Sequence, residues 1–245
     1  MAFIRSALFA FVLLLITPVF ATVALLSSGQ PPHRRYRWIG GWTTIAMWFI
    51  RHLLGIRHRV IGTENMPDRA SVALVKHQSA WETIALQRIL PPICFVLKRE
   101  LLRLPFFGWG LARMPTIAID RAAGKDALTQ VVDQGRVLLD EGFWVVIFPE
   151  GTRVAPGTTR RYKPGGAWLA SHTGVPVVPI AHNAGEFWRK NAFVKQPGEI
   201  VVSIGPAIDP SGLSTDEINK QAEAWIEAEM RRLFPHHYAD ESAKA

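Results

Sequence analysis

An uncharged apolar run near the N-terminus constrains the fold of this chain more than any other feature. From Ala7 to Leu26 the sequence reads ALFAFVLLLITPVFATVALL, without a charged side chain. About 20 apolar residues are the length that a helix needs to cross a bilayer core. We therefore predict a membrane-associated helix. The alternative is a cleaved signal peptide, whose first two regions are matched by Arg5 and the apolar run.

The charges on either side of the run predict its orientation. Arg5 is the one basic side chain before it. The downstream flank carries His33, Arg34, Arg35, Arg37, Arg51, Arg57 and Arg59. Because positive charge is retained on the cytoplasmic side of membranes, we predict an inner-membrane protein whose body lies on the cytoplasmic side.

A second apolar stretch, Trp38 to Leu54, is rich in Trp and short for a membrane span. Such segments favour the headgroup layer, so it predicts an interfacial helix packed beside the first. A buried core helix is the alternative. Together, residues 1–56 are predicted to form a membrane helix and an interfacial helix.

Beyond residue 57, short apolar runs alternate with segments of helical period, which indicates an α/β domain around one sheet. The predicted strands are Arg59–Ile61, Ser71–Val75, Ile93–Leu97, Thr116–Ile119, Trp144–Phe148, Val175–Ile180 and Glu199–Ile204. The predicted helices are Ser79–Ile89, Gly124–Leu139, Pro164–Ser171 and Ser214–Leu233. We assign this domain to residues 57–234 and a polar tail to residues 235–245.

Composition limits the possible partners and site chemistry. The net charge is +8, and 49% of the residues are hydrophobic. A basic, apolar chain suits an anionic lipid or a phosphorylated substrate. Nucleic acid is not expected, because the charge is not gathered on a face interleaved with aromatic residues. Cys94 is the one cysteine, which excludes an intramolecular disulfide and a zinc site with several Cys ligands.

The segment KHQSAWET begins at Lys76, directly after a predicted strand. His77 and Glu82 meet only if His77 lies in the loop before the helix, since residues five apart on one helix lie about 140° apart. A carboxylate on one imidazole nitrogen fixes the tautomer and makes the other nitrogen a better general base. The alternative is a structural histidine.

The segment FPEGTR, residues 148–153, also follows a predicted strand. Its Gly151 permits a tight turn, and Glu150, Thr152 and Arg153 would project from a strand end, where open α/β sheets bind ligands. The fork of an arginine suits phosphate oxygens. An ordinary turn with a surface ion pair is the alternative.

Further basic side chains are candidates for phosphate binding. Arg121 follows the predicted strand that ends at Ile119, and Lys98 follows another. The cluster Arg160–Lys163 can attract an anionic donor or anionic headgroups. A solvated salt bridge or basic loop is the alternative for each.

Taken together, these segments resemble the glycerolipid acyltransferase family. That family carries H-x-x-x-x-D, a motif ending in a basic residue, F-P-E-G-T-R and V-P-[IV]-[IV]-P. All four occur here in that order between His77 and Pro179, with Glu82 in the place of the usual Asp. The resemblance implies a single acyltransferase domain with a central mixed sheet flanked by helices.

The resemblance also implies an activity. His77, oriented by Glu82, takes the proton from the sn-2 hydroxyl of lysophosphatidic acid, which attacks the thioester of acyl-CoA or acyl-carrier protein and gives phosphatidic acid. The glycerol phosphate would be held by Arg121, Glu150 and Arg153. Gly151 and Thr152 would shape the turn, and Lys98 is a further candidate. Neither a cofactor nor a metal is expected. Membrane lipids are the expected partners.

Two alternatives stay open. The acceptor can be another lyso-lipid, such as lyso-ornithine lipid, because the catalytic segment would be unchanged. The chain can also be a catalytically inactive, membrane-bound lipid-binding homologue, a reading whose one support is the Glu82 replacement.

Overall fold

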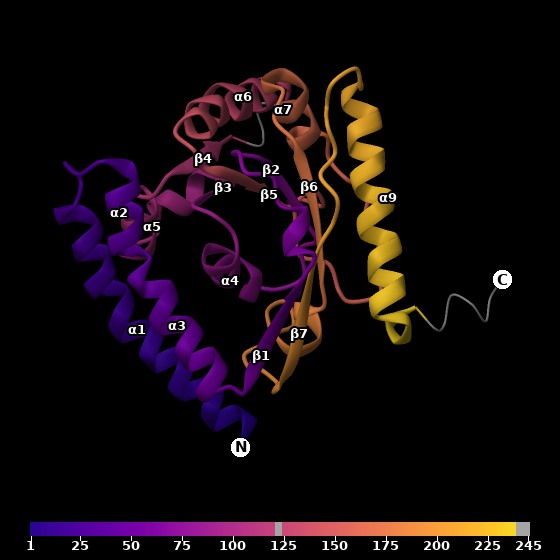
Figure 1. Ribbon diagram of the computed structural model, residues 1–245. Coiled ribbons are helices and arrows are strands. Elements are labelled where there is room, and N and C mark those ends of the chain that lie inside the picture. Colours follow the sequence, from indigo (N-terminus) through magenta and orange to yellow (C-terminus); the bar gives the residue numbers. More distant parts are fainter. Residues whose placement is uncertain (121–123, 239–245) are drawn as a thin grey trace.

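The computed structural model describes residues 1–120 and 124–238. Within them, seven strands form one sheet in the order β1-β7-β6-β2-β5-β3-β4 (Figure 1). Neighbouring strands are parallel except for β6 and β7, which are antiparallel. The predicted α/β domain with a central mixed sheet is therefore confirmed. The strands are β1 (Ile56–Ile61), β2 (Val72–Val75), β3 (Ile93–Lys98), β4 (Thr116–Ile119), β5 (Trp144–Ile147), β6 (Val177–His182) and β7 (Gly198–Ile204).

Helices cover both faces of the sheet (Figure 1). One face carries α1, α3 and α4, and the other carries α6, α7 and α9. The helices are α1 (Ala2–Leu26), α2 (Pro32–Ile39), α3 (Gly41–His52), α4 (Trp81–Ile89), α5 (Phe107–Leu111), α6 (Lys125–Asp140), α7 (Gly165–Thr173), α8 (Ala184–Phe187) and α9 (Thr215–Leu233). A capping box formed by Ser214 and Glu217 opens α9.

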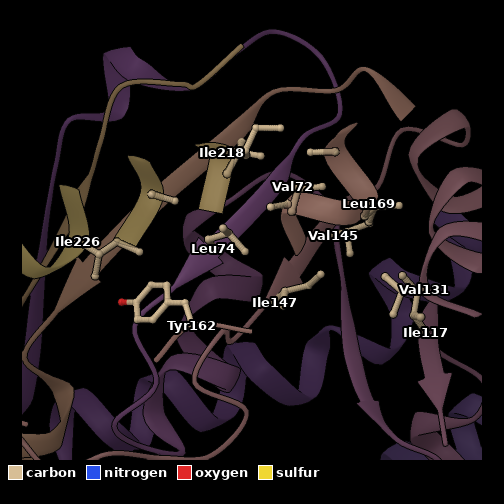
Figure 2. Close-up of a cluster of buried hydrophobic side chains, with 14 of the residues drawn as sticks. Val72, Leu74, Ile117, Val131, Val145, Ile147, Tyr162, Leu169, Ile218 and Ile226 are labelled. Carbon is tan, nitrogen blue, oxygen red and sulfur yellow. The ribbon is translucent and has the colours of Figure 1, made fainter. Parts of the chain in front are cut away.

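The central strands bury both of their faces, which explains their continuous apolar sequences. On β2, Val72 and Leu74 belong to the cluster beneath α6, α7 and α9, which Figure 2 shows. Ala73 and Val75 belong to the cluster on the opposite face, beneath α3 and α4. A rigid, fully buried β2 therefore ends directly before the His77 segment.

The second apolar stretch is not one continuous helix as predicted: it contains all of α3, and its first residues, Trp38 and Ile39, end the preceding helix α2. Helix α2 ends at Ile39 and α3 begins at Gly41. A Cβ at Gly41 would lie 2.8 Å from the Phe20 ring of α1, so glycine permits the close approach of these helices. Helix α3 buries Ile50, as a core helix would, and leaves Trp48 57% exposed, as an interfacial helix would.

Helix α1 lies along the α/β domain for most of its length. Near its start, the Ser6 hydroxyl accepts a hydrogen bond from the Lys195 N–H (2.9 Å). Near its end, Ala21 packs beside Gly110 of α5. An 18-residue stretch of this helix has a mean hydropathy of 2.6, and its 25 residues would suit a membrane span. Its outer face is apolar and exposed, with Phe3, Ile4, Leu8, Phe11, Leu14, Leu15 and Val19.

Candidate active site

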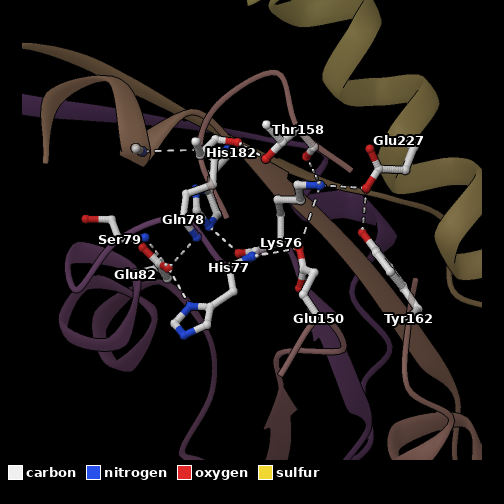
Figure 3. Close-up of polar contacts among 12 residues, drawn as sticks. Lys76, His77, Gln78, Ser79, Glu82, Glu150, Thr158, Tyr162, His182 and Glu227 are labelled. Atoms are coloured by element: carbon white, nitrogen blue, oxygen red, sulfur yellow. Dashed lines mark hydrogen bonds and ion pairs between the residues drawn. The ribbon is translucent and has the colours of Figure 1, made fainter. Parts of the chain in front are cut away.

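Three polar segments meet where the parallel strands β2, β5 and β6 end (Figure 3). His77 lies two residues beyond β2, Glu150 lies three residues beyond β5, and His182 is the last residue of β6. Because parallel strands end at the same edge of the sheet, segments distant in sequence come together there.

His77 lies in the loop before α4, so it can reach Glu82 on the first turn of that helix. The His77 Nδ1 and the Glu82 Oε1 are 2.9 Å apart. Since a carboxylate accepts hydrogen bonds, Nδ1 carries the proton and Nε2 is left as the basic nitrogen. The His77 ring also stacks on Phe148, with the ring centroids 4.0 Å apart. These two contacts fix the plane of the imidazole.

Glu82 is fully buried, and neighbouring hydrogen-bond donors stabilise its negative charge. Its Oε1 also accepts hydrogen bonds from the backbone N–H groups of Gln78 (3.0 Å) and Ser79 (2.8 Å). Burial by itself raises the pKa of Glu82, but the hydrogen bond with His77 and the Ser79 N–H act in the opposite direction, and the pKa lies below its ordinary value. Glu82 is therefore a carboxylate at neutral pH.

His182 supports this loop from behind as a neutral imidazole. Its Nε2 lies 2.7 Å from the Lys76 carbonyl, which can only accept, so Nε2 carries the proton. Its Nδ1 accepts the Ala184 N–H at 3.2 Å. Burial lowers the pKa of His182, against the opposite effect of Glu82. Both ring nitrogens are thus used in holding the backbone beside His77.

Lys76 is fully buried between two carboxylates (Figure 3). Its Nζ lies 2.6 Å from the Glu227 Oε1 on α9 and 3.7 Å from the Glu150 Oε1. The Tyr162 hydroxyl donates to the same Glu227 oxygen at 3.1 Å. A buried charge needs such partners to offset its desolvation. The network ties the C-terminal helix to the residue next to His77.

Glu150 is also fully buried, and its contacts are with the protein. Its Oε1 accepts the His77 N–H at 3.2 Å. Burial raises the pKa of Glu150 to about 7, although Lys76 and the His77 N–H act in the opposite direction. Its predicted contact with substrate stays a prediction. In the structure it holds the His77 backbone.

A cavity of about 320 Å³ opens beside His77. Phe148, Gly151 and Lys163 line it next to the histidine. Its other walls are mainly apolar and come from β3, β4, β5 and α6, with Val96, Ile119, Ala127, Leu128, Val131 and Ile147. The site therefore combines an oriented imidazole, a nearby lysine and room for an apolar group.

Comparison with known proteins identifies the family. The Acyltransferase family model matches residues 57–183. The chain is 45% identical over 237 residues to a 1-acyl-sn-glycerol-3-phosphate acyltransferase of Pseudomonas aeruginosa, covering 95% of this chain and 92% of that one. This chain belongs to the Acyltransferase family.

Other acyltransferases agree with this assignment. A 1-acyl-sn-glycerol-3-phosphate acyltransferase of Borreliella burgdorferi is 32% identical over 176 residues, covering 71% of this chain and 68% of that one. The crystal structure of the 1-acyl-sn-glycerophosphate (LPA) acyltransferase from Thermotoga maritima matches with a TM-score of 0.78. It is 22% identical and covers 94% of this chain and 95% of that chain, so it supports the fold.

The remaining predicted site residues lie at different places in this acyltransferase. Gly151 has a φ of +70°, which glycine adopts without strain, and the Lys163 side chain lies over it. Lys190 donates to the Thr152 hydroxyl (3.5 Å) and to the Arg153 carbonyl (3.0 Å). Lys98 is exposed at the end of β3. Arg121 lies outside the described residues.

Sequence reasoning did not single out three residues that build this acyltransferase site. Lys76 gives one signal, since a lysine that directly follows a buried strand needs a buried partner. His182 ends an apolar strand and carries no distinguishing pattern. Glu227 lies on α9, 151 residues from Lys76, and reads as an ordinary polar position of an amphipathic helix.

Proposed function

We propose that this acyltransferase moves an acyl group from a thioester donor to the sn-2 hydroxyl of lysophosphatidic acid and forms phosphatidic acid. The observation that carries the proposal is the hydrogen bond between the His77 Nδ1 and the buried Glu82, beside an apolar cavity. The names of the relatives support the choice of acceptor. The reaction belongs to phospholipid biosynthesis.

The proposed mechanism is general-base catalysis by His77. Glu82 holds the ring with its proton on Nδ1, so Nε2 can take the proton of the acceptor hydroxyl. The hydroxyl oxygen forms a bond to the thioester carbonyl carbon as that proton leaves. The carbon–sulfur bond then breaks, and the thiolate receives the proton back from the imidazolium. Glu82 stabilises the imidazolium formed between these steps.

Direct transfer, without an acyl-cysteine intermediate, fits the properties of the protein's cysteine. Cys94 is the one cysteine of the sequence and is buried in β3. Its burial raises the pKa of the thiol, which suppresses the reactive thiolate. Cys94 is therefore no candidate for the nucleophile.

We assign the binding of the acceptor phosphate to Arg121 and Arg153. Arg153 follows the Gly151 turn and is partly exposed, and we extend this role to Arg121 from its place after β4. A guanidinium can bind two phosphate oxygens at once. Exposed Lys98 and Lys163 supply positive charge for the phosphates of acyl-CoA or acyl-carrier protein.

The apolar outer face of α1 is proposed to lie in the membrane interface. Because α1 contacts the α/β domain from Ser6 to Ala21, a perpendicular span would draw that domain into the bilayer. An in-plane helix leaves the domain in water and brings lipid substrates to the site. The basic residues that follow α1 support a location on the cytoplasmic side of the inner membrane, because that leaflet is anionic.

The test is an acceptor and donor panel with purified protein in lipid nanodiscs. Lysophosphatidic acid, lyso-ornithine lipid and lysophosphatidylcholine are each combined with acyl-CoA or with acyl-carrier protein, and free thiol and acylated product are followed together. We expect product from lysophosphatidic acid. Exclusive use of lyso-ornithine lipid would replace the proposed acceptor, and failure with every pair would favour an inactive lipid-binding homologue.

A further inference from the structure

A second polar cluster joins the C-terminus of α9 to the short helix α8, away from the cavity beside His77. It contains Glu186 of α8 and the consecutive histidines His236 and His237, which follow α9. Each offers one ligand atom, and these atoms lie within 4.8 Å of one another. Both histidine Nε2 atoms lie 2.5 Å from the same Glu186 Oε1.

From this arrangement we infer that Glu186, His236 and His237 form a binding site for a divalent d-block cation such as Zn²⁺. Two imidazoles and one carboxylate are a ligand set that Zn²⁺ accepts, with water completing a four-coordinate shell. On a tetrahedral ion with bonds of about 2.0–2.1 Å, neighbouring ligand atoms lie roughly 3.3 Å apart. The two carboxylate–imidazole distances of 2.5 Å therefore need to widen by about 0.8 Å to admit the ion.

The surroundings hold the carboxylate in place. Asn183 donates from Nδ2 to the other Glu186 oxygen at 2.7 Å. The Asn183 Oδ1 in turn accepts the Val201 N–H of β7 at 2.9 Å. Such outer-shell partners fix the orientation of a metal-binding carboxylate. The side-chain exposures are 18% for Glu186, 11% for His237 and 63% for His236, so one side of the cluster is open for an ion to enter.

A cation here would clamp the end of α9 to the segment that supports the catalytic loop. The Gly185 N–H, next to Glu186, donates to the Gln78 side chain behind His77 (3.1 Å). The His237 carbonyl lies so close to Gly157 that a Cβ at Gly157 would be 2.2 Å from it. Gly157 belongs to the loop that follows the FPEGTR segment. The predicted role is thus structural, and it is independent of the reaction at His77.

The test measures Zn²⁺ and Co²⁺ binding to full-length protein from which any histidine tag has been removed. We expect one equivalent of Zn²⁺ by calorimetry and tetrahedral Co²⁺ absorption bands. Zn²⁺ at about 100 times its Kd should raise the melting temperature by roughly 5–10 °C. Neither readout depends on enzymatic activity.

Matched variants separate this site from other histidines. His236→Ala removes an exposed ligand without disturbing the core, and Glu186→Gln keeps the carboxylate's shape without its charge. Each should weaken Zn²⁺ binding by more than the roughly 10–100-fold expected for loss of an outer-shell partner. His172→Ala, at an exposed position of α7, should bind as the wild type does. Unchanged binding in His236→Ala and Glu186→Gln, or no stoichiometric binding by the wild type, overturns the proposal.

Discussion

Replacing Glu150 with glutamine should make the protein more stable at alkaline pH. Burial raises the pKa of Glu150 from 4.5 to about 7. Between these values the native protein binds a proton that the unfolded chain does not, so stability falls as the pH rises through this range. The stabilising contribution is full below pH 4.5 and lost above about pH 7. A pKa difference of about 2.5 units corresponds to about 3 kcal/mol.

Glutamine keeps the shape of the neutral carboxyl and cannot ionise, so Glu150→Gln should lack this loss. The assay is thermal unfolding in detergent from pH 4.5 to 8, followed by the fluorescence of the nine tryptophans. The variant's melting temperature should rise relative to the wild type by roughly 6–12 °C over this range.

The difference between the two proteins isolates the Glu150 contribution, because both contain the other titrating groups. Burial lowers the pKa of His182, so its contribution has the opposite sign: it is present above pH 6.5 and is lost as the pH falls. Glu64→Gln, at an exposed position, is the matched control and should run parallel to the wild type. Parallel wild-type and Glu150→Gln curves would refute the burial argument.

Three further predictions concern the proposed catalytic pair, the proposed phosphate site and the buried network around Lys76. Glu82→Gln removes the charge from the hydrogen bond to His77 and should lower kcat by about 10–100-fold, whereas Glu82→Asp keeps the carboxylate and should stay more active than Glu82→Gln. Equal kcat values for the two variants would contradict the role of the charge. Arg153→Ala should raise the KM for lysophosphatidic acid by about 10–100-fold, with partial rescue by Arg153→Lys, and an unchanged KM would remove Arg153 from the phosphate site. Lys76→Met leaves two buried carboxylates without their cation and should destabilise the fold by about 3–5 kcal/mol in denaturant titration; a wild-type midpoint would contradict the buried network.

Much of the fold could be predicted from local sequence patterns. Continuous apolar runs such as 144–147 predict buried strands, because both of their faces need apolar neighbours. The break between α2 and α3 was not predicted, because Gly40 and Gly41 lie in an apolar stretch that fits one helix. Gly41 is required by the approach of Phe20 on α1, a tertiary contact that periodicity does not encode.

The proposed catalytic pair could be predicted from the sequence because its geometry is local. His77 and Glu82 are only five positions apart, and the loop between β2 and α4 brings their side chains together. The support of that loop is not local. The charge of Lys76 indicates that a buried partner is needed, but only the packing of α9 against β6 selects Glu227 for that role. Likewise, Glu150 lies in a segment that suggests ligand binding, while burial directs its carboxylate toward the protein.

The most direct test of the central claim is the turnover of His77→Ala with lysophosphatidic acid and the donor found active in the panel. Phosphatidic acid formation should fall by about 10²–10⁴-fold, the contribution typical of a general base. The melting temperature should stay close to that of the wild type, because the His77 side chain lies at the cavity. His172→Ala serves as the matched control and should keep wild-type turnover. Full turnover by folded His77→Ala would contradict His77 as the base.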